Sequence, residues 1–234
     1  MSESESPRAS RHVLSHDQTL AGYDRWAASY DATDNPMVAA TAWALQNEPL
    51  DVHDAAVVEL GCGTGRHAAP TLRSGARTFT GVDGSTGMLQ RARAAFGDDR
   101  IRWQHGEVHA TGLPSAAFDV VLIVLVFEHL RDLTPICREA ARLLRRGGRL
   151  RVLEIHPDLL ANGTNAHFHD SGVEHRFTSV HHDVEAIRGA IDDAGFTITR
   201  AAEHRAEGEL LRAVPRLSKH AGRLVLLDVA AKRG

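Results

Sequence analysis

The sequence predicts an α/β fold in three layers, a doubly wound and mostly parallel sheet with helices on both faces. Short apolar runs alternate with helical patterns from residue 56 onward, which is typical of parallel strands joined by right-handed crossovers. A turn over 61–65 carries glycine at every second position, directly after an apolar strand. The length of 234 residues allows one α/β core to bury most of the surface of the unfolded chain.

The first half of the chain shows the alternation in order. A mainly helical segment is expected over 15–47. The first strand, 56–60, contains adjacent β-branched residues, which favour an extended backbone. A helix over 66–74 follows the glycine turn, and a second apolar strand over 78–82 ends at a carboxylate.

The second half continues the same pattern. Ser85 has the character of an N-cap and predicts a helix over 86–96. The longest apolar run, 120–127, has the length of a buried strand and is too short to span a membrane. The other expected strands are 101–105, 119–125, 149–155, 196–201 and 224–230, and the other expected helices are 132–145 and 183–194.

The glycine turn predicts a loop that binds a nucleotide-type cofactor. Gly61, Gly63 and Gly65 fit a sharp turn in which backbone N–H groups approach a ligand with no Cβ between them. The spacing G-x-G-x-G differs from the G-x-G-x-x-G of dinucleotide folds, so we do not expect a pyrophosphate there. Three glycines in five residues also occur in plain turns, so the prediction needs support from other residues.

Asp83 supplies that support. It ends the second strand 22 positions after Gly61, and an acidic residue about 20 positions beyond the glycine loop binds a ribose diol in doubly wound folds. We therefore expect Asp83 to accept hydrogen bonds from a ribose, with Met88 on the first turn of the next helix.

These segments resemble the class I S-adenosylmethionine-dependent methyltransferases, and the resemblance extends over most of the chain. The first motif of the family is similar to residues 59–65, and the acid at the second strand end is similar to 81–83. The later matching segments are 106–108 with 113–114, 118–123, and 143–150. The resemblance implies a seven-stranded sheet whose last strand is antiparallel, and S-adenosylmethionine as cofactor.

The resemblance also implies a set of cofactor contacts. Glu59 would help to hold the ammonium group of the cofactor, and Glu107 stands where the family more often has aspartate, against the adenine. The expected cofactor-binding residues are Tyr23, Tyr30, Glu59, Gly61, Cys62, Gly63, Asp83, Gly84, Ser85, Met88, Gly106, Glu107, Val108 and Val124.

Two segments are expected to cover the carboxyl ends of the strands, where ligands bind in such sheets. One is an N-terminal helical cover over 13–50, in which Tyr23 and Tyr30 share one helical face. The other is a lid over about 156–182, which shows little helical or strand periodicity. We expect residues 1–12, rich in Ser, Glu and Arg, to form a disordered tail without a secretory signal, and 13–234 to form one domain.

Several histidines follow strand ends and are candidates for a general base, since their unperturbed pKa lies near neutrality. His129 and His156 are the two candidates, with Tyr30 as a further catalytic candidate. His167 and His169 would share a face of an extended segment. Neither this pair nor the other lid histidines has the spacing of a closed zinc site, so no metal ligands are expected.

Composition limits the partners. The chain has 27 basic and 30 acidic residues and a net charge of −3, which gives no electrostatic footprint for nucleic acid or an anionic membrane. Cys62 and Cys137 lack metal or redox spacing, so we expect a reducing cytoplasm.

The expected function is methyl transfer to a small organic molecule such as a specialised metabolite, with nitrogen, oxygen or carbon as acceptor. The alternatives are an RNA-base methyltransferase and a protein that uses bound S-adenosylmethionine only as a scaffold. The segment 125–128 does not resemble the Asn/Asp-Pro-Pro-aromatic loop that many base methyltransferases use. Both a monomer and a homodimer are compatible with the sequence.

Overall fold

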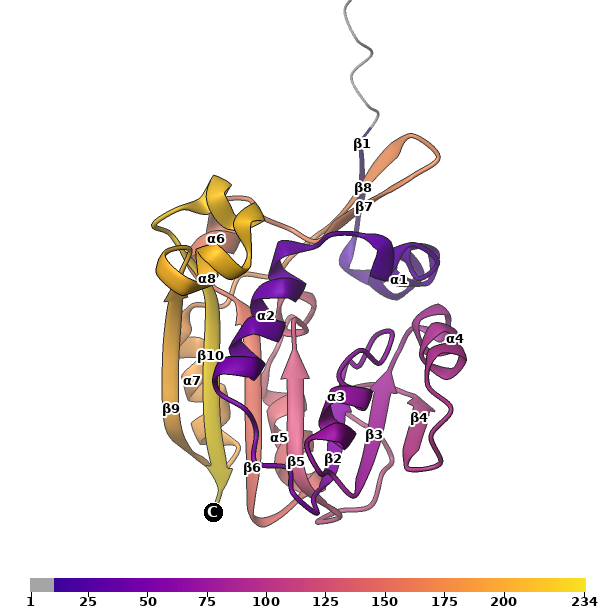
Figure 1. The fold of residues 1–234 in the computed structure, drawn as a ribbon, viewed down its shortest axis with the longest axis vertical. Helices are drawn as coiled ribbons and strands as arrows, with labels where there is room; N and C mark the ends of the chain where they lie inside the picture. Colours follow the sequence, from indigo (N-terminus) through magenta and orange to yellow (C-terminus); the bar gives the residue numbers. More distant parts are fainter. Residues whose placement is uncertain (1–10) are drawn as a thin grey trace, which may run out of the picture.

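A computed structural model describes residues 11–234 (Figure 1). The expected disordered tail over 1–12 falls largely outside these residues. Its last two residues correct that prediction, because Arg11 and His12 belong to a strand, β1 (Arg11–Leu14). Among residues 11–234, no helix has both the length and the apolar character needed to cross a membrane.

The centre of the molecule is a seven-stranded sheet, as the sequence predicts. In spatial order its strands are β4 (Ile101–His105), β3 (Thr78–Asp83), β2 (Ala56–Leu60), β5 (Phe118–Val124), β6 (Leu144–Ile155), β10 (Leu224–Arg233) and β9 (Phe196–Arg205). The first five are mutually parallel, whereas β10 pairs antiparallel with both β6 and β9. The predicted antiparallel last strand is therefore confirmed, and it lies between its two neighbours.

Helices cover both faces of this sheet because alternate strand residues point to opposite sides. The helices that follow or precede the central strands are α2 (Pro36–Asn47), α3 (Ala68–Arg73), α4 (Thr86–Ala95), α5 (Thr134–Leu143) and α7 (Val184–Asp193). Val58 and Val121 pack in the cluster that contains α5 and α7, whereas Val57 and Leu122 pack toward α3 and α2, respectively. Figure 1 shows α2 and α3 in front of the sheet and α5 and α7 behind it.

The expected N-terminal helix over 15–47 is interrupted. It divides into a short 3-10 turn η1 (His16–Gln18), α1 (Thr19–Trp26), a second turn η2 (Tyr30–Ala32) and α2. The break between α1 and α2 lets the chain cross the carboxyl ends of the strands before it descends along the sheet (Figure 1).

The lid contains regular structure, which corrects the expectation of an irregular loop. It begins with α6 (Pro157–Ala161) and continues as a hairpin of β7 (His167–Asp170) and β8 (Val173–Phe177). β1 adds to the hairpin as a parallel partner of β8 and completes a three-stranded sheet. The strands were not expected because they are only four and five residues long and consist mostly of charged residues and histidines.

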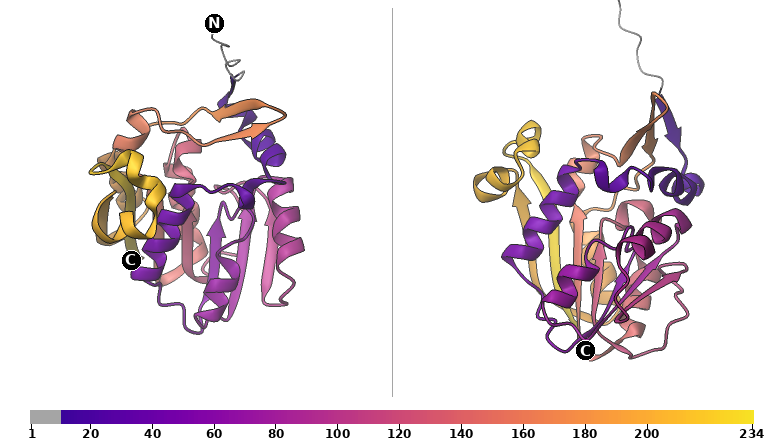
Figure 2. Two further views of the ribbon diagram at one scale, coloured as in Figure 1. Left: turned by 45° about the horizontal axis from the view of Figure 1, so that its top comes forward. Right: turned by 45° about the vertical axis from the view of Figure 1, so that its right-hand side comes forward.

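The N-terminal cover and the lid therefore form one cap above the strand ends (Figure 2). We use the word cap for β1, η1, α1, η2 and the β7–β8 hairpin. The two halves, far apart in sequence, share an apolar cluster of Leu14, Trp26, Phe168 and Phe177. Trp26 stacks on Phe168 with ring centroids 5.4 Å apart and an interplanar angle of 14°. Burial of these rings holds the cap together.

The antiparallel strand β10 carries a buried charge. Asp228 is fully buried, and one of its oxygens accepts hydrogen bonds from Arg151 on β6 and Arg200 on β9, each at 2.6 Å. Burial alone would raise the pKa of Asp228, but the nearby His204 and the two guanidinium groups hold it below its usual value. A buried carboxylate with two guanidinium partners fixes the pairing of three adjacent strands.

Asp228→Asn should therefore lower the free energy of unfolding by about 3 kcal/mol or more, because it leaves buried guanidinium charge without a partner. Urea unfolding followed by circular dichroism measures the change. Asp98→Asn, which removes an exposed pair with Arg100, is the matched control and should leave the free energy of unfolding nearly unchanged. Equal losses in both variants would contradict a structural role for the buried charge.

Candidate active site

A cavity of about 470 Å³ lies at the carboxyl ends of β2, β3, β4 and β5, beneath the cap. Its walls contain every residue expected to bind the cofactor except Ser85. His129, one of the expected bases, also lines it. We call this space the first cavity.

Asp83 holds the floor of the first cavity together. Its Oδ2 accepts the N–H of Gly63 at 2.7 Å, and its Oδ1 accepts the N–H of Ser85 at 2.8 Å. Burial raises the pKa of Asp83, while these two donors act in the opposite direction. Each carboxylate oxygen retains acceptor capacity beyond its N–H donor, so the pair can still bind two hydroxyl groups.

Ser85 does not line the first cavity, which corrects its assignment as a cofactor contact. The side chain is fully buried, and its hydroxyl oxygen accepts the N–H of Met88 as the N-cap of α4. The hydroxyl donates to Asp24 of the cap at 2.6 Å. Asp24 also accepts the N–H of Gly87 at 2.7 Å, so a cap carboxylate sits at the N-terminus of α4, where the helix dipole favours negative charge.

Glu59, on β2, is a second buried carboxylate that lines the first cavity. Only 1 % of its surface is exposed, and Oε1 is 2.7 Å from Nδ1 of His67. Its Oε2 is buried without a hydrogen-bond partner among the described residues, as is Nε2 of His67. A buried, incompletely bonded carboxylate that lines a cavity is suited to a cationic group. The sequence did not identify His67, because a histidine at the start of a helix has the pattern of a surface residue.

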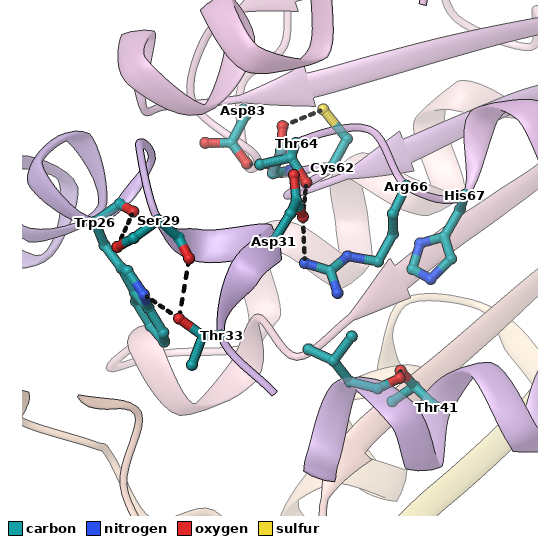
Figure 3. A network of polar contacts seen from close by, with 12 residues as sticks. Trp26, Ser29, Asp31, Thr33, Thr41, Cys62, Thr64, Arg66, His67 and Asp83 are labelled. Atoms are coloured by element: carbon teal, nitrogen blue, oxygen red, sulfur yellow. Dashed lines mark hydrogen bonds and ion pairs between the residues drawn. The ribbon is translucent and has the colours of Figure 1, made fainter. Parts of the chain in front are cut away.

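The cap is tied to the glycine loop through Asp31, whose Oδ1 accepts from the hydroxyl of Thr64 at 2.8 Å (Figure 3). The same oxygen lies 3.4 Å from Arg66, whose guanidinium sits 4.9 Å from the ring centroid of Tyr30. Arg66 lines the first cavity and is positioned there by these contacts. No local sequence pattern indicates this role, since the contacting residues lie 33 to 36 positions apart in the chain.

A second cavity of about 390 Å³ adjoins the first. Tyr23, Tyr30 and Leu125 line both spaces and form the wall between them. Leu125 has φ of 57°, a left-handed conformation that is uncommon for a residue other than glycine. Backbone strain of this kind clusters at functional sites. The other residues around the second cavity come from α1, the segment 33–37, the lid and the segment η4 (Pro215–His220), together with Glu128 and Ile155.

Tyr23 and His129 form a hydrogen-bonded pair in this wall. The phenol oxygen lies 2.7 Å from Nε2 of His129, and burial raises the pKa of Tyr23 and lowers that of His129. Both groups are therefore neutral near pH 7, with the phenol donating to the imidazole. Glu128, 4 % exposed, has one oxygen 3.9 Å from the same Nε2, and its other oxygen accepts from Ser179 of the lid at 2.6 Å.

His156 is placed differently from its expected role as a base. It is 1 % exposed and lines neither cavity. Its Nδ1 accepts the N–H of Asp158 at the start of α6, and its Nε2 is 2.9 Å from Glu203 on β9. Both ring nitrogens are engaged in fixing the lid to the sheet, so the side chain cannot reach a ligand in these cavities.

The other histidines of the lid have separate positions. His167 lines the second cavity, and its ring lies 6.3 Å from that of His169, as expected for residues two apart on a strand. His175 stacks on Phe168 inside the cap. Within residues 11–234, no group of three or more metal-ligating side chains is assembled.

Glu154, at the end of β6, carries an unusual proton. Its Oε1 accepts the N–H groups of Val126 and Phe127 at 3.0 and 3.1 Å. Complete burial nevertheless raises its pKa from 4.5 to about 8. The carboxyl group therefore stays protonated at neutral pH while it holds the backbone that follows Leu125.

This proton predicts a pH-dependent stability. The native state keeps a proton that the unfolded state releases above pH 4.5, so Glu154 should lower the free energy of unfolding progressively from about pH 5 to pH 8. Glu154→Gln keeps an oxygen acceptor and removes the titration, so its stability relative to the natural protein should rise by about 2 to 4 kcal/mol over that interval. Urea unfolding at several pH values measures this difference. Glu185→Gln, on the exposed first turn of α7, should show no such trend.

Comparisons with known proteins agree with this geometry. A family model described as "Methyltransferase domain" matches residues 58–152. An uncharacterized methyltransferase of Mycobacterium tuberculosis is 31 % identical over 120 residues, which span 51 % of this chain and 60 % of that protein. An uncharacterized methyltransferase of Emericella nidulans is 27 % identical over 229 residues, with 80 % and 78 % of the two chains covered.

A solved structure extends the likeness to the whole sheet. The crystal structure of an S-adenosylmethionine-dependent methyltransferase from Mesorhizobium loti superposes with a TM-score of 0.71 and 25 % identity, and covers 83 % of this chain and 98 % of that one. Together with the strand order and the glycine loop, these matches support a class I methyltransferase with S-adenosylmethionine as its cofactor.

Proposed function

We propose that this protein transfers a methyl group from S-adenosylmethionine to a small organic molecule. The observation that supports this most directly is the pair of adjoining cavities under the cap, separated by Tyr23, Tyr30 and Leu125. One cavity has the loop and carboxylates suited to the cofactor, and the other has the size of a small-molecule site.

The residues of the first cavity fit the cofactor in three places. Asp83 would accept the two ribose hydroxyls, and Glu59, with its unpartnered Oε2, would hold the ammonium group. Arg66 would face the carboxylate of the same amino-acid portion. Glu107, Val108 and Met88 line the region past Asp83 and would surround the adenine.

When bound, the cofactor would supply a methyl group on a sulfonium for in-line transfer to a lone pair of the acceptor, with the sulfur as leaving group. The chain must hold the acceptor in line with the carbon–sulfur bond of the cofactor and must exclude water. Such positioning can lower the reaction barrier by several kcal/mol. The acceptor, if it is a hydroxyl, also loses a proton. The geometry suits transfer of this proton to the oxygen of Tyr23 as the phenol proton moves to Nε2 of His129. The nearby Glu128 carboxylate would stabilise the resulting imidazolium.

The cap favours a small acceptor over an RNA base. It covers the carboxyl ends of the strands, and it contributes the carboxylates of Asp24 and Asp31 beside the site. The net charge of −3 agrees with this choice. Free, buried Cys62 and Cys137 favour a reducing compartment such as the cytoplasm.

Calorimetric titration with S-adenosylmethionine and S-adenosylhomocysteine, followed by an acceptor screen that detects S-adenosylhomocysteine, tests the proposal. Micromolar binding of both with turnover on a small acceptor would support it. Binding without turnover on any acceptor would favour the scaffold alternative, and turnover on RNA alone would favour the base methyltransferase.

Gly63→Ala should weaken cofactor binding by at least about tenfold. Gly63 lines the first cavity with φ of 53°, and a Cβ built there would meet no protein atom within 4 Å, so it would occupy space reserved for the ligand. Gly112→Ala is a matched control, because Gly112 has φ of 70° and equally open surroundings but lines neither cavity. Calorimetry on both variants separates backbone strain from ligand contact, and equal affinities would argue against the loop assignment.

Tyr23→Phe and His129→Asn should each lower turnover by about 10²-fold on a hydroxyl acceptor found in the screen, because each removes one member of the proton-accepting pair. Turnover is measured at saturating cofactor, together with the dissociation constant for S-adenosylhomocysteine. His182→Asn removes a comparable hydrogen bond, to the carbonyl of Leu130, and should retain the natural rate. Natural rates in the first two variants would leave positioning alone as the mechanism.

A further inference from the structure

The second cavity has an uneven distribution of charge that bears on the acceptor. The sequence contains only two lysines, and one of them, Lys219 on η4, lines this cavity. Lys219 is exposed, so it lies at the open side of the space. It makes no ion pair with any carboxylate of residues 11–234, whereas its neighbour Arg216 is paired with Asp34 at 2.7 Å.

The other groups at this open side do not compete for an anion. Burial and the adjacent cations Lys219 and Arg223 lower the pKa of His220, so its ring is neutral near pH 7. Asn165 and Thr164, from the lid, add polar groups without charge. Within the described part of the chain, Lys219 is thus the one lysine or arginine along the cavity that has no ion-pair partner.

The buried end of the cavity has a different character. Glu128 and Tyr23 lie there, next to His129, and Trp26 and Tyr30 contribute aromatic walls. Glu128 already accepts from Ser179 and faces the imidazole of His129, which would become charged. Its carboxyl group therefore already has partners within the protein. A cationic ligand at this end would compete with that imidazolium and would leave Lys219 unpaired.

We propose that the second cavity binds a small aromatic or cyclic acid that carries a hydroxyl group, with its anionic group on Lys219 and its hydroxyl at Tyr23. This inference rests on the proposed function and names the acceptor class for that same site. Aromatic walls suit the ring, and Tyr23, which lines both cavities, would place the hydroxyl beside the first cavity.

Four matched probes test the charge and the hydroxyl separately. They are 4-hydroxyphenylacetate, the neutral 4-ethylphenol, the cationic tyramine, and phenylacetate, which lacks the hydroxyl. Each is titrated calorimetrically into the full chain saturated with S-adenosylhomocysteine, and each is then offered as acceptor with S-adenosylmethionine. We expect 4-hydroxyphenylacetate to bind about fivefold or more tightly than 4-ethylphenol and tyramine.

Variants assign the effect to the residue. Lys219→Gln should remove the preference for 4-hydroxyphenylacetate over 4-ethylphenol, and Lys219→Glu should shift the preference to tyramine. Lys232→Gln changes the only other lysine, near the end of β10, and should behave as the natural protein. Tyr23→Phe should reduce the difference between 4-hydroxyphenylacetate and phenylacetate without changing the effect of Lys219→Gln.

Three results would overturn the proposal: tightest binding of tyramine to the natural protein, an unchanged anion preference in Lys219→Gln, or no binding of any probe while S-adenosylhomocysteine still binds. In each case the titration with S-adenosylhomocysteine tests the proposed function separately, because that ligand would bind in the first cavity. Loss of S-adenosylhomocysteine binding itself would instead contradict the proposed function.

Discussion

The carboxylate of Asp83 is the interaction on which the rest of the site depends. It ends β3 and accepts N–H groups from both the glycine loop after β2 and the start of α4. Two segments from different crossovers are thereby fixed relative to one another at the strand ends. Because the backbone donors are few and directional, they position the carboxylate while part of its acceptor capacity remains for a ligand. The same residue therefore organises the loop and forms the floor of the first cavity.

The cap extends this organisation upward. Asp24 binds the start of α4, which Asp83 and Ser85 have already fixed, and Asp31 binds the glycine loop at Thr64. The aromatic cluster of Trp26, Phe168 and Phe177 joins the cover to the lid, so two segments far apart in the sequence together cover the site. The polar contacts of Asp24 and Asp31 hold the cap against the sheet, and the apolar cluster holds the cover and the lid together. These contacts keep in place the few side chains that separate the two cavities.

Burial determines which titratable side chains beneath the cap are neutral. Tyr23 and His129 are both neutral because desolvation disfavours their charged forms, and Glu154 keeps its proton for the same reason. One carboxyl oxygen of Glu128 lies 3.9 Å from Nε2 of His129. A proton taken up by His129 during a reaction would thus be accommodated next to an acidic side chain.

Local patterns in the sequence predicted the sheet and most of the residues that line the first cavity. Apolar strands, a glycine turn and a strand-end acid are local signals, since each depends on backbone geometry within a few residues. The same signals placed Glu59, Gly61, Gly63 and Asp83 around one space. Ser85 shows the limit of this reasoning, because an N-cap and a ligand contact have the same local pattern and differ only in where the side chain points.

The cap, the second cavity and the different contacts of the histidines became evident only in the three-dimensional structure. His129 and His156 each follow a strand end, yet one meets Tyr23 and the other is held by Asp158 and Glu203. The pairing of β1 with β8, separated by 163 positions between Arg11 and Glu174, depends on long-range association that no local pattern encodes. The physical reason is that side-chain partners across such distances are selected by packing of the whole fold, whereas a turn or a cap is selected by its neighbours in the chain.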